Sequence, residues 1–185
     1  MSNFIMDHPV LAVTVIGSFL GTLIAYISPY FTRNQLCAGE GFRIGNFGLY
    51  VFVHDGWGHL IGNYLYVIPA ALMIEHLCNR TGCPIGLIFG IMIFNTFIGI
   101  IPIWFSDDLD ICGLSSNAIM LLEMSFVWFG MLSERLKVLW FIAAIAEAII
   151  IIYTDSITTK NYKFGHILGI VLGAVFGFGF YFFLA

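Results

Sequence analysis

The chain has 185 residues, of which 60% are hydrophobic and only 10% carry a charged side chain. A water-soluble domain has roughly 25% charged residues, so this composition excludes one and requires lipid as the main solvent of the surface. The net charge of −4 and the lack of any basic run argue against nucleic acid as a partner.

Six apolar segments follow one another along the chain, at about the 20 residues that a membrane-spanning helix needs. Lipid offers no partners to backbone polar groups, so these spans must be helical. The sequence therefore predicts an all-α membrane protein, a six-transmembrane-helix bundle that forms one domain over residues 1–185. Pro69 is expected to interrupt the second span. The predicted spans are 9–28, 56–77, 84–105, 114–132, 136–153 and 164–185.

The ends of these segments carry few targeting or redox signals. The first span is not expected to be a cleavable signal peptide, because it lacks a basic leader and residues 26–29 make a poor cleavage site. The four cysteines are scattered, and the spacing of Cys78 and Cys83 is not that of a zinc site. We therefore expect four free thiols, no metal and no cofactor. The Lys and Arg residues of the predicted loops do not decide the orientation in the membrane.

Polar side chains gather at the beginning of the even-numbered spans. His54, His59 and Asn63 lie at the start of the second, Ser115 opens the fourth and His166 opens the sixth. In a chain of six spans, every even-numbered helix enters from the same membrane face. We therefore expect these five side chains to lie at a similar depth on one side, and polar groups inside a membrane are functional candidates.

This set of residue types is suited to acyl transfer. Ser115 lies at a helix N-terminus, where free N–H groups stabilise negative charge, and His59 and Asn63 share a helix face from which both could donate to an oxyanion. His166 also lies at a helix N-terminus, which favours a neutral imidazole that can act as a base for the serine hydroxyl. His54 is expected to precede its helix and to hold a loop.

A glycine stripe in the last span supports a meeting of base and nucleophile. Gly165, Gly169, Gly173 and Gly177 recur every four residues, a pattern that lets two helix backbones approach closely. His166 lies beside this stripe and would be held against the neighbouring helix. Taken one at a time, these features have ordinary explanations: a helix cap, a packing histidine and a helix–helix contact.

At these residues the sequence resembles the rhomboid family of intramembrane serine proteases. His54, His59 and Asn63 reproduce the spacing of the family's second-helix signature, and Glu75 follows twelve residues later, where the family has an acidic residue. Residues 113–115 match the Gly-x-Ser segment of the nucleophile helix. Residues 165–173 match the glycine-rich motif around the base.

The resemblance implies a Ser–His dyad without a third acid, with Ser115 as nucleophile and His166 as base. His59, Asn63 and the Ser115 backbone N–H would form the oxyanion hole. Such enzymes cut transmembrane protein substrates near the membrane surface. They keep both termini of the six-helix core in the cytoplasm, with the dyad toward the outside of the cell (inner) membrane. The residues implied to be structural near the site are His54, Gly113 and Gly169.

Several positions depart from the family pattern. Ser116 replaces the usual glycine after the nucleophile, Ile119 replaces an aromatic residue that packs on the base, and Gly165 replaces alanine. Glu123 stands where a small residue is expected, and the Trp-Arg pair of the first loop is not evident, although Arg43 lies nearby. A catalytically inactive rhomboid-like protein that binds transmembrane clients is therefore the alternative function.

Two carboxyl groups, Glu123 and Glu147, lie deep in apolar runs. They are interpreted as a hydrogen-bonded structural pair, with a proton relay as the alternative. A third function, a small transporter or metal-handling protein, would use His54, His59, His166 and these acids. It is disfavoured because His54 and His59 do not share a helix face and no Cys or Asp completes a ligand set.

Overall fold

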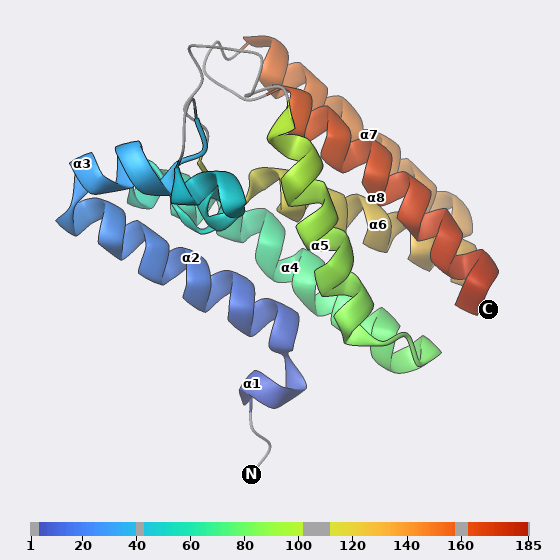
Figure 1. The fold of residues 1–185 in the computed structure, drawn as a ribbon. Coiled ribbons are helices and arrows are strands. Elements are labelled where there is room, and N and C mark those ends of the chain that lie inside the picture. Colours follow the sequence, from blue (N-terminus) through green and yellow to red (C-terminus); the bar gives the residue numbers. More distant parts are fainter. Residues whose placement is uncertain (1–3, 40–42, 102–111, 158–162, 185) are drawn as a thin grey trace.

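A computed structural model describes residues 4–39, 43–101, 112–157 and 163–184, and every regular element in these ranges is helical (Figure 1). Short π- and 3₁₀-helical turns (η1 to η3) lie between α3 and α4. The elements, in chain order, are α1 (Phe4–Asp7), α2 (Pro9–Ile27), α3 (Pro29–Phe31), η1 (Thr32–Leu36), η2 (Ile44–Phe47), η3 (Leu49–Phe52), α4 (Trp57–Thr81), α5 (Ile85–Gly99), α6 (Ser115–Leu132), α7 (Lys137–Ile157) and α8 (Lys163–Leu184).

The six predicted apolar helices occur in the predicted order. Five of them (α2, α4, α6, α7 and α8) are long and apolar enough to cross a membrane. The other, α5, has 15 residues and is about 22 Å long at 1.5 Å per residue, which is short of a hydrocarbon core of about 30 Å. The predicted end of this third span, at residue 105, lies outside the described residues. The expected interruption at Pro69 does not end the second span, because α4 continues through it.

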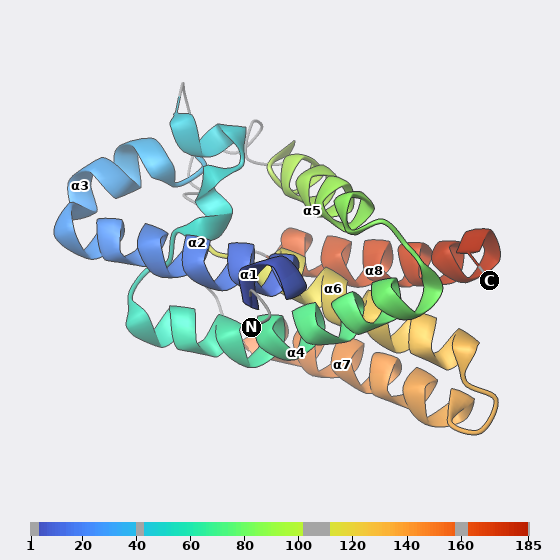
Figure 2. The ribbon, with the colours of Figure 1, turned by 90° about the horizontal axis from the view of Figure 1, so that it is seen from below.

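Helix α6 lies at the centre of the bundle. It packs against α4, α7 and α8, as the view from below also shows (Figure 2). Its apolar side chains are buried almost all round, including the fully buried Trp128, which stacks at a tilt on Phe180 of α8. Because α6 is packed between other helices, the position of the Ser115 side chain at its start is fixed by the bundle.

The outer faces of the bundle are apolar. On α7, large aliphatic side chains are more than half exposed at four positions one helical turn or so apart: Val138, Ile142, Ile145 and Ile149. Such a continuous apolar surface is stable only against lipid. The chain is therefore a multi-pass integral membrane protein, as its composition predicts.

The acidic residue of the second span, Glu75, stabilises the start of α2. Its carboxylate accepts a 3.0 Å hydrogen bond from the backbone N–H of Leu11 and lies 2.9 Å from His8 Nδ1. Leu11 is in the first turn of α2, where N–H groups have no partner within the helix and the helix dipole favours an anion. Glu75 thus joins α4 to α2.

In its described residues, the segment between α3 and α4 forms a series of short helical turns, η1 to η3. Tyr50, in η3, connects it to the rest of the bundle. The Tyr50 hydroxyl donates to the carbonyl of Thr96, and the Tyr50 carbonyl accepts from the N–H of Gly113, both at 3.0 Å. Gly113, which leads into Ser115, is therefore hydrogen-bonded to a residue that is itself held by Thr96 of α5.

Candidate active site

Ser115 and His166 meet at one end of the bundle. Ser115 is the first residue of α6, and its hydroxyl Oγ lies 2.9 Å from Nε2 of His166, in the first turn of α8. This distance is that of a hydrogen bond between a hydroxyl and an imidazole. The two groups that the sequence places at the same membrane level therefore lie in direct contact.

The glycine stripe of α8 explains this contact. A β-carbon at Gly169 would lie 2.7 Å from the Ser116 carbonyl, and one at Gly173 would lie 2.6 Å from the Met120 carbonyl. At Gly177 it would lie 2.8 Å from Val127 Cβ. No side chain fits at these distances, so glycine is what allows the backbones of α8 and α6 to touch. The neighbour of the stripe is the fourth predicted span, as the meeting of base and nucleophile requires.

His59 and Asn63 of α4 lie beside the segment that leads into Ser115. They lie against the backbone of Gly113, two residues before Ser115: a β-carbon there would be 2.9 Å from His59 Cε1 and 3.5 Å from Asn63 Nδ2. Gly113 has a φ of +113°, a conformation that other residues rarely adopt. Glycine at this position therefore meets both a backbone and a space requirement.

A cleft of 140 Å³ lies beside Ser115, and His59 is not among the described residues that line it. Ser115, His166 and Asn63 line it, together with residues of α4, α6 and α7 (Tyr66, Ala118, Ile119, Ile151, Thr154 and Asp155). Asn63 is 7% exposed, and its Nδ2 has no hydrogen-bond partner in the described part of the chain. A buried amide donor without a partner is costly, so a free donor beside the serine is suited to an oxyanion.

His54 lies before α4, as expected, and holds the neighbouring loop. Its ring is 1% exposed, hydrogen-bonds to the Thr22 hydroxyl at 3.3 Å and meets the His59 ring edge-on at 5.1 Å. Burial, followed by the nearby charge of His59, lowers the pKa of His54 from 6.5 to about 4. His54 is therefore a neutral structural group near neutral pH.

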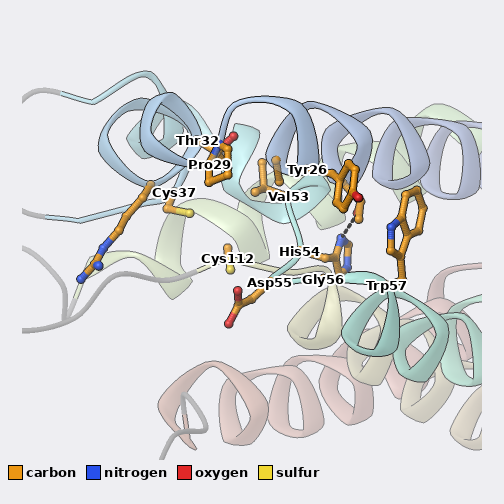
Figure 3. Close-up of a pocket in the computed structure, with 13 residues that line it drawn as sticks. Tyr26, Pro29, Thr32, Cys37, Val53, His54, Asp55, Gly56, Trp57 and Cys112 are labelled. Atoms are coloured by element: carbon orange, nitrogen blue, oxygen red, sulfur yellow. Dashed lines mark hydrogen bonds between the residues drawn. The ribbon is translucent and has the colours of Figure 1, made fainter.

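On the far side of His54 lies a larger cavity of 580 Å³ (Figure 3). The end of α2 and the segment after it border one side, with Tyr26, Pro29 and Thr32, and the turn into α4 borders the other, with His54 and Trp57. Neither Ser115 nor His166 lines this cavity. The His54 ring, which lines this cavity, meets the His59 ring edge-on.

Cys37 and Cys112 line the same cavity, and none of the four cysteines is in a disulfide in the described structure. A hydrogen bond with Cys37 and burial together raise the pKa of the Cys112 thiol. Both effects disfavour the reactive thiolate.

A third side chain at the base was missed by the sequence reasoning. Both carboxylate oxygens of Asp155, in the last turn of α7, lie 2.9 Å from His166 Nδ1. The predicted end of this span at residue 153 left Asp155 outside the helix. The signal that could have found it is the same counting argument: an odd-numbered span ends at the face where the even-numbered spans begin.

Ile119, which replaces the expected aromatic residue, packs on Gly169 and lines the cleft beside His166. No ring therefore lies on the base at this position. The edge of the imidazole is held instead by Asp155.

The two deep acids, Glu123 of α6 and Glu147 of α7, are 5% and 6% exposed and lie close enough to interact electrostatically. Two ionised carboxylates have no proton to share, and in that form Glu147 has no hydrogen-bond partner among the described residues. With one proton between them, the two carboxyl groups lie within reach of the direct hydrogen bond that was inferred.

Comparison with curated proteins found no match, and comparison with solved structures found none either. The family model of the rhomboid domain matches residues 42–182, which is most of the chain. The matched range includes α4 to α7, most of α8, and the residues Asn63, Ser115, Asp155 and His166. The chain therefore belongs to the rhomboid family.

Proposed function

We propose that the protein is an intramembrane serine endopeptidase, with Ser115 as nucleophile and His166 as general base. The observation that carries this proposal is the 2.9 Å distance between Ser115 Oγ and His166 Nε2. A hydroxyl becomes an effective nucleophile when a base at this distance takes its proton. Membership of the rhomboid family supports the same reaction.

The acylation step follows from these positions. Ser115 Oγ attacks the carbonyl carbon of a peptide bond while its proton passes to His166 Nε2. The negative charge that develops on the carbonyl oxygen faces the free N–H groups at the start of α6. The side-chain donors of His59 and Asn63 lie beside Gly113, two residues before the start of α6. The proton then passes from Nε2 to the departing amine, and water releases the acyl group by the reverse sequence.

The substrate class follows from where the cleft lies. Its lining combines polar groups with Ala118, Ile119 and Ile151, and it lies at the end of the bundle where α6 and α8 begin and α7 ends. A peptide reaching Ser115 must therefore come from near a membrane surface, which suits a transmembrane segment unwound at its end. We infer that this end faces outward from the cell (inner) membrane, with both termini in the cytoplasm.

The test is covalent labelling and substrate cleavage by the purified full chain in detergent. The wild type should react with a fluorophosphonate probe and should cleave a transmembrane reporter. Ser115→Ala and His166→Ala should do neither, although both variants should remain folded. Ser125→Ala is the matched control, because Ser125 is buried in the same helix and bonds only to Leu121 of that helix among the described contacts. It should label like the wild type.

Wild-type turnover by Ser115→Ala would refute the proposal. If the wild type neither labels nor cleaves, but co-purifies with transmembrane proteins, the chain is instead an inactive relative that binds clients. The departures at Ser116 and Ile119 are the features that would favour that outcome.

A further inference from the structure

His166 is held at both ring nitrogens. Nε2 lies 2.9 Å from Ser115 Oγ, and Nδ1 lies 2.9 Å from each carboxylate oxygen of Asp155. The three residues come from three different helices, α6, α8 and α7. The imidazole therefore lies between a hydroxyl at Nε2 and a carboxylate at Nδ1.

The Asp155 carboxylate is buried beside this ring nitrogen, at the edge of the candidate site. Asp155 is 5% exposed and its side chain lines the cleft that contains Ser115. Burial of a carboxylate without a hydrogen-bonding partner is costly, and a geometry in which both oxygens approach one N–H satisfies that need. Through its contact with His166, Asp155 also links the last turn of α7 to the first turn of α8.

This contact selects the tautomer of the base. A carboxylate only accepts hydrogen bonds, so Nδ1 must carry the proton that joins it to Asp155. The remaining nitrogen, Nε2, then presents its lone pair to the Ser115 hydroxyl, which donates. The opposite tautomer would point a proton at the serine and could not accept one.

We propose that Asp155 is a positioning residue that completes a Ser115–His166–Asp155 triad in this protein. The proposal rests on the protease function proposed above and replaces the dyad without a third acid that the resemblance implies. During acylation the serine proton moves to Nε2, and the resulting imidazolium keeps its Nδ1 proton, which Asp155 accepts as a hydrogen bond. The carboxylate does not itself take up a proton and is unchanged at the end of the cycle.

The departure at Ile119 fits this assignment. A base that lacks an aromatic ring against its face needs another group to fix its plane, and the Asp155 carboxylate provides one at its Nδ1 edge. Among the described residues, the charged and titratable groups near His166 include Asp155 from α7 and His59 and Tyr66 from α4. Of these, only Asp155 makes a hydrogen bond to the ring in the described structure.

The test compares Asp155→Asn with wild type in the full chain in detergent. An asparagine keeps the size of the side chain but can donate to Nδ1, which favours the wrong tautomer. We expect kcat for reporter cleavage and the rate of fluorophosphonate labelling to fall roughly 10²- to 10⁴-fold, with KM little changed. In ¹⁵N-histidine NMR spectra, the His166 signals should shift from the Nδ1–H to the Nε2–H pattern. Asp155→Glu should recover part of the lost rate.

Glu147→Gln is the matched control. It removes another buried carboxyl from the same helix, eight residues and about 12 Å away along the axis. Its labelling rate and its His166 tautomer should match the wild type. A similar loss in both variants would mean that Asp155 acts only through the packing of α7, which would overturn the proposal.

The outcomes also separate this proposal from the function on which it rests. If Ser115→Ala abolishes labelling but Asp155→Asn labels and cleaves at the wild-type rate, the triad is refuted and the protease proposal stands. If Ser115→Ala still cleaves at the wild-type rate, the protease proposal itself fails, whatever Asp155→Asn does. An unchanged His166 tautomer in Asp155→Asn would likewise refute the positioning role.

Discussion

Ser116 Oγ donates a 2.7 Å hydrogen bond to the backbone carbonyl of Gly165. The two residues are the immediate neighbours of Ser115 and His166, so this bond joins the chain beside the proposed nucleophile to the chain beside the proposed base. Ser116 Oγ also accepts a 3.1 Å hydrogen bond from Asn95 Nδ2 of α5. The glycine that rhomboid proteins usually have here could make neither contact. The departure at this position thus adds a link between α5, α6 and α8.

The Ser116 link predicts a measurable loss of stability. Ser116→Ala removes both hydrogen bonds and should lower the free energy of unfolding by about 1 to 2 kcal/mol. Thermal or denaturant unfolding in detergent micelles measures this. Ser125→Ala, which removes only a bond within α6, should have a smaller effect. Equal stability of the two variants would contradict a tethering role for Ser116.

The glycine stripe predicts a steric effect at Gly173. Gly173→Val would place its β-carbon 2.6 Å from the Met120 carbonyl and 2.7 Å from Glu123 Cβ, so α8 must move away from α6. We expect a loss of about 1 to 3 kcal/mol in unfolding free energy. Gly179→Val, on the same helix with nothing within 4 Å of its β-carbon, supplies the control and should unfold like the wild type. A stable Gly173→Val variant would argue against direct backbone contact.

The backbone at Gly113 predicts a loss of activity. Gly113→Ala adds a methyl group 2.9 Å from His59 Cε1 and strains a φ of +113°. The segment before Ser115 should shift, and the rate of probe labelling should fall roughly tenfold or more, as a displacement of reacting groups by a fraction of an ångström does. Gly82→Ala has comparable backbone strain at a φ of +72° but open space around it, so its labelling rate should not change.

The buried His54 predicts a pH dependence of stability. Its pKa is about 4 in the folded chain against 6.5 for the free side chain, so between these values the unfolded chain binds a proton that the folded chain does not. Stability should therefore fall as the pH drops from 6.5 to 4, by up to about 3 kcal/mol from this residue. Unfolding curves at pH 7.5, 6 and 5 measure it. His54→Gln should flatten the decline, and an equally steep decline in that variant would exclude His54 as its source.

The cap supplied by Glu75 predicts an effect on stability alone. Glu75→Gln weakens the interaction with the α2 N-terminus and with His8, and should lower the unfolding free energy by about 1 kcal/mol. Probe labelling of Ser115 in the folded variant should be unchanged. Glu134→Gln removes an exposed carboxylate after α6 and should change neither quantity. A large loss of labelling in Glu75→Gln would indicate a contribution to the site that the contacts do not explain.

The sequence predicted the fold and most of the candidate site, because both depend on one-dimensional rules. Apolar segment length determines the spans, and the order of the spans determines which ends share a membrane face. Ser115 and His166, 51 residues apart, could therefore be placed together by counting. The interval of four between the glycines likewise predicted a close helix contact before the partner helix was known.

Only the tertiary structure decided which other side chains contact Ser115 and His166. Asp155 lies in the last turn of α7, and no spacing rule gives the direction of a terminal side chain toward His166 Nδ1. The short length of α5 could not be predicted either, because an apolar segment does not show where its helix ends. Hydrophobicity along the chain determines depth in a membrane, whereas the rotation of one helix against another is set by packing, and that rotation decides whether Asp155 reaches the base.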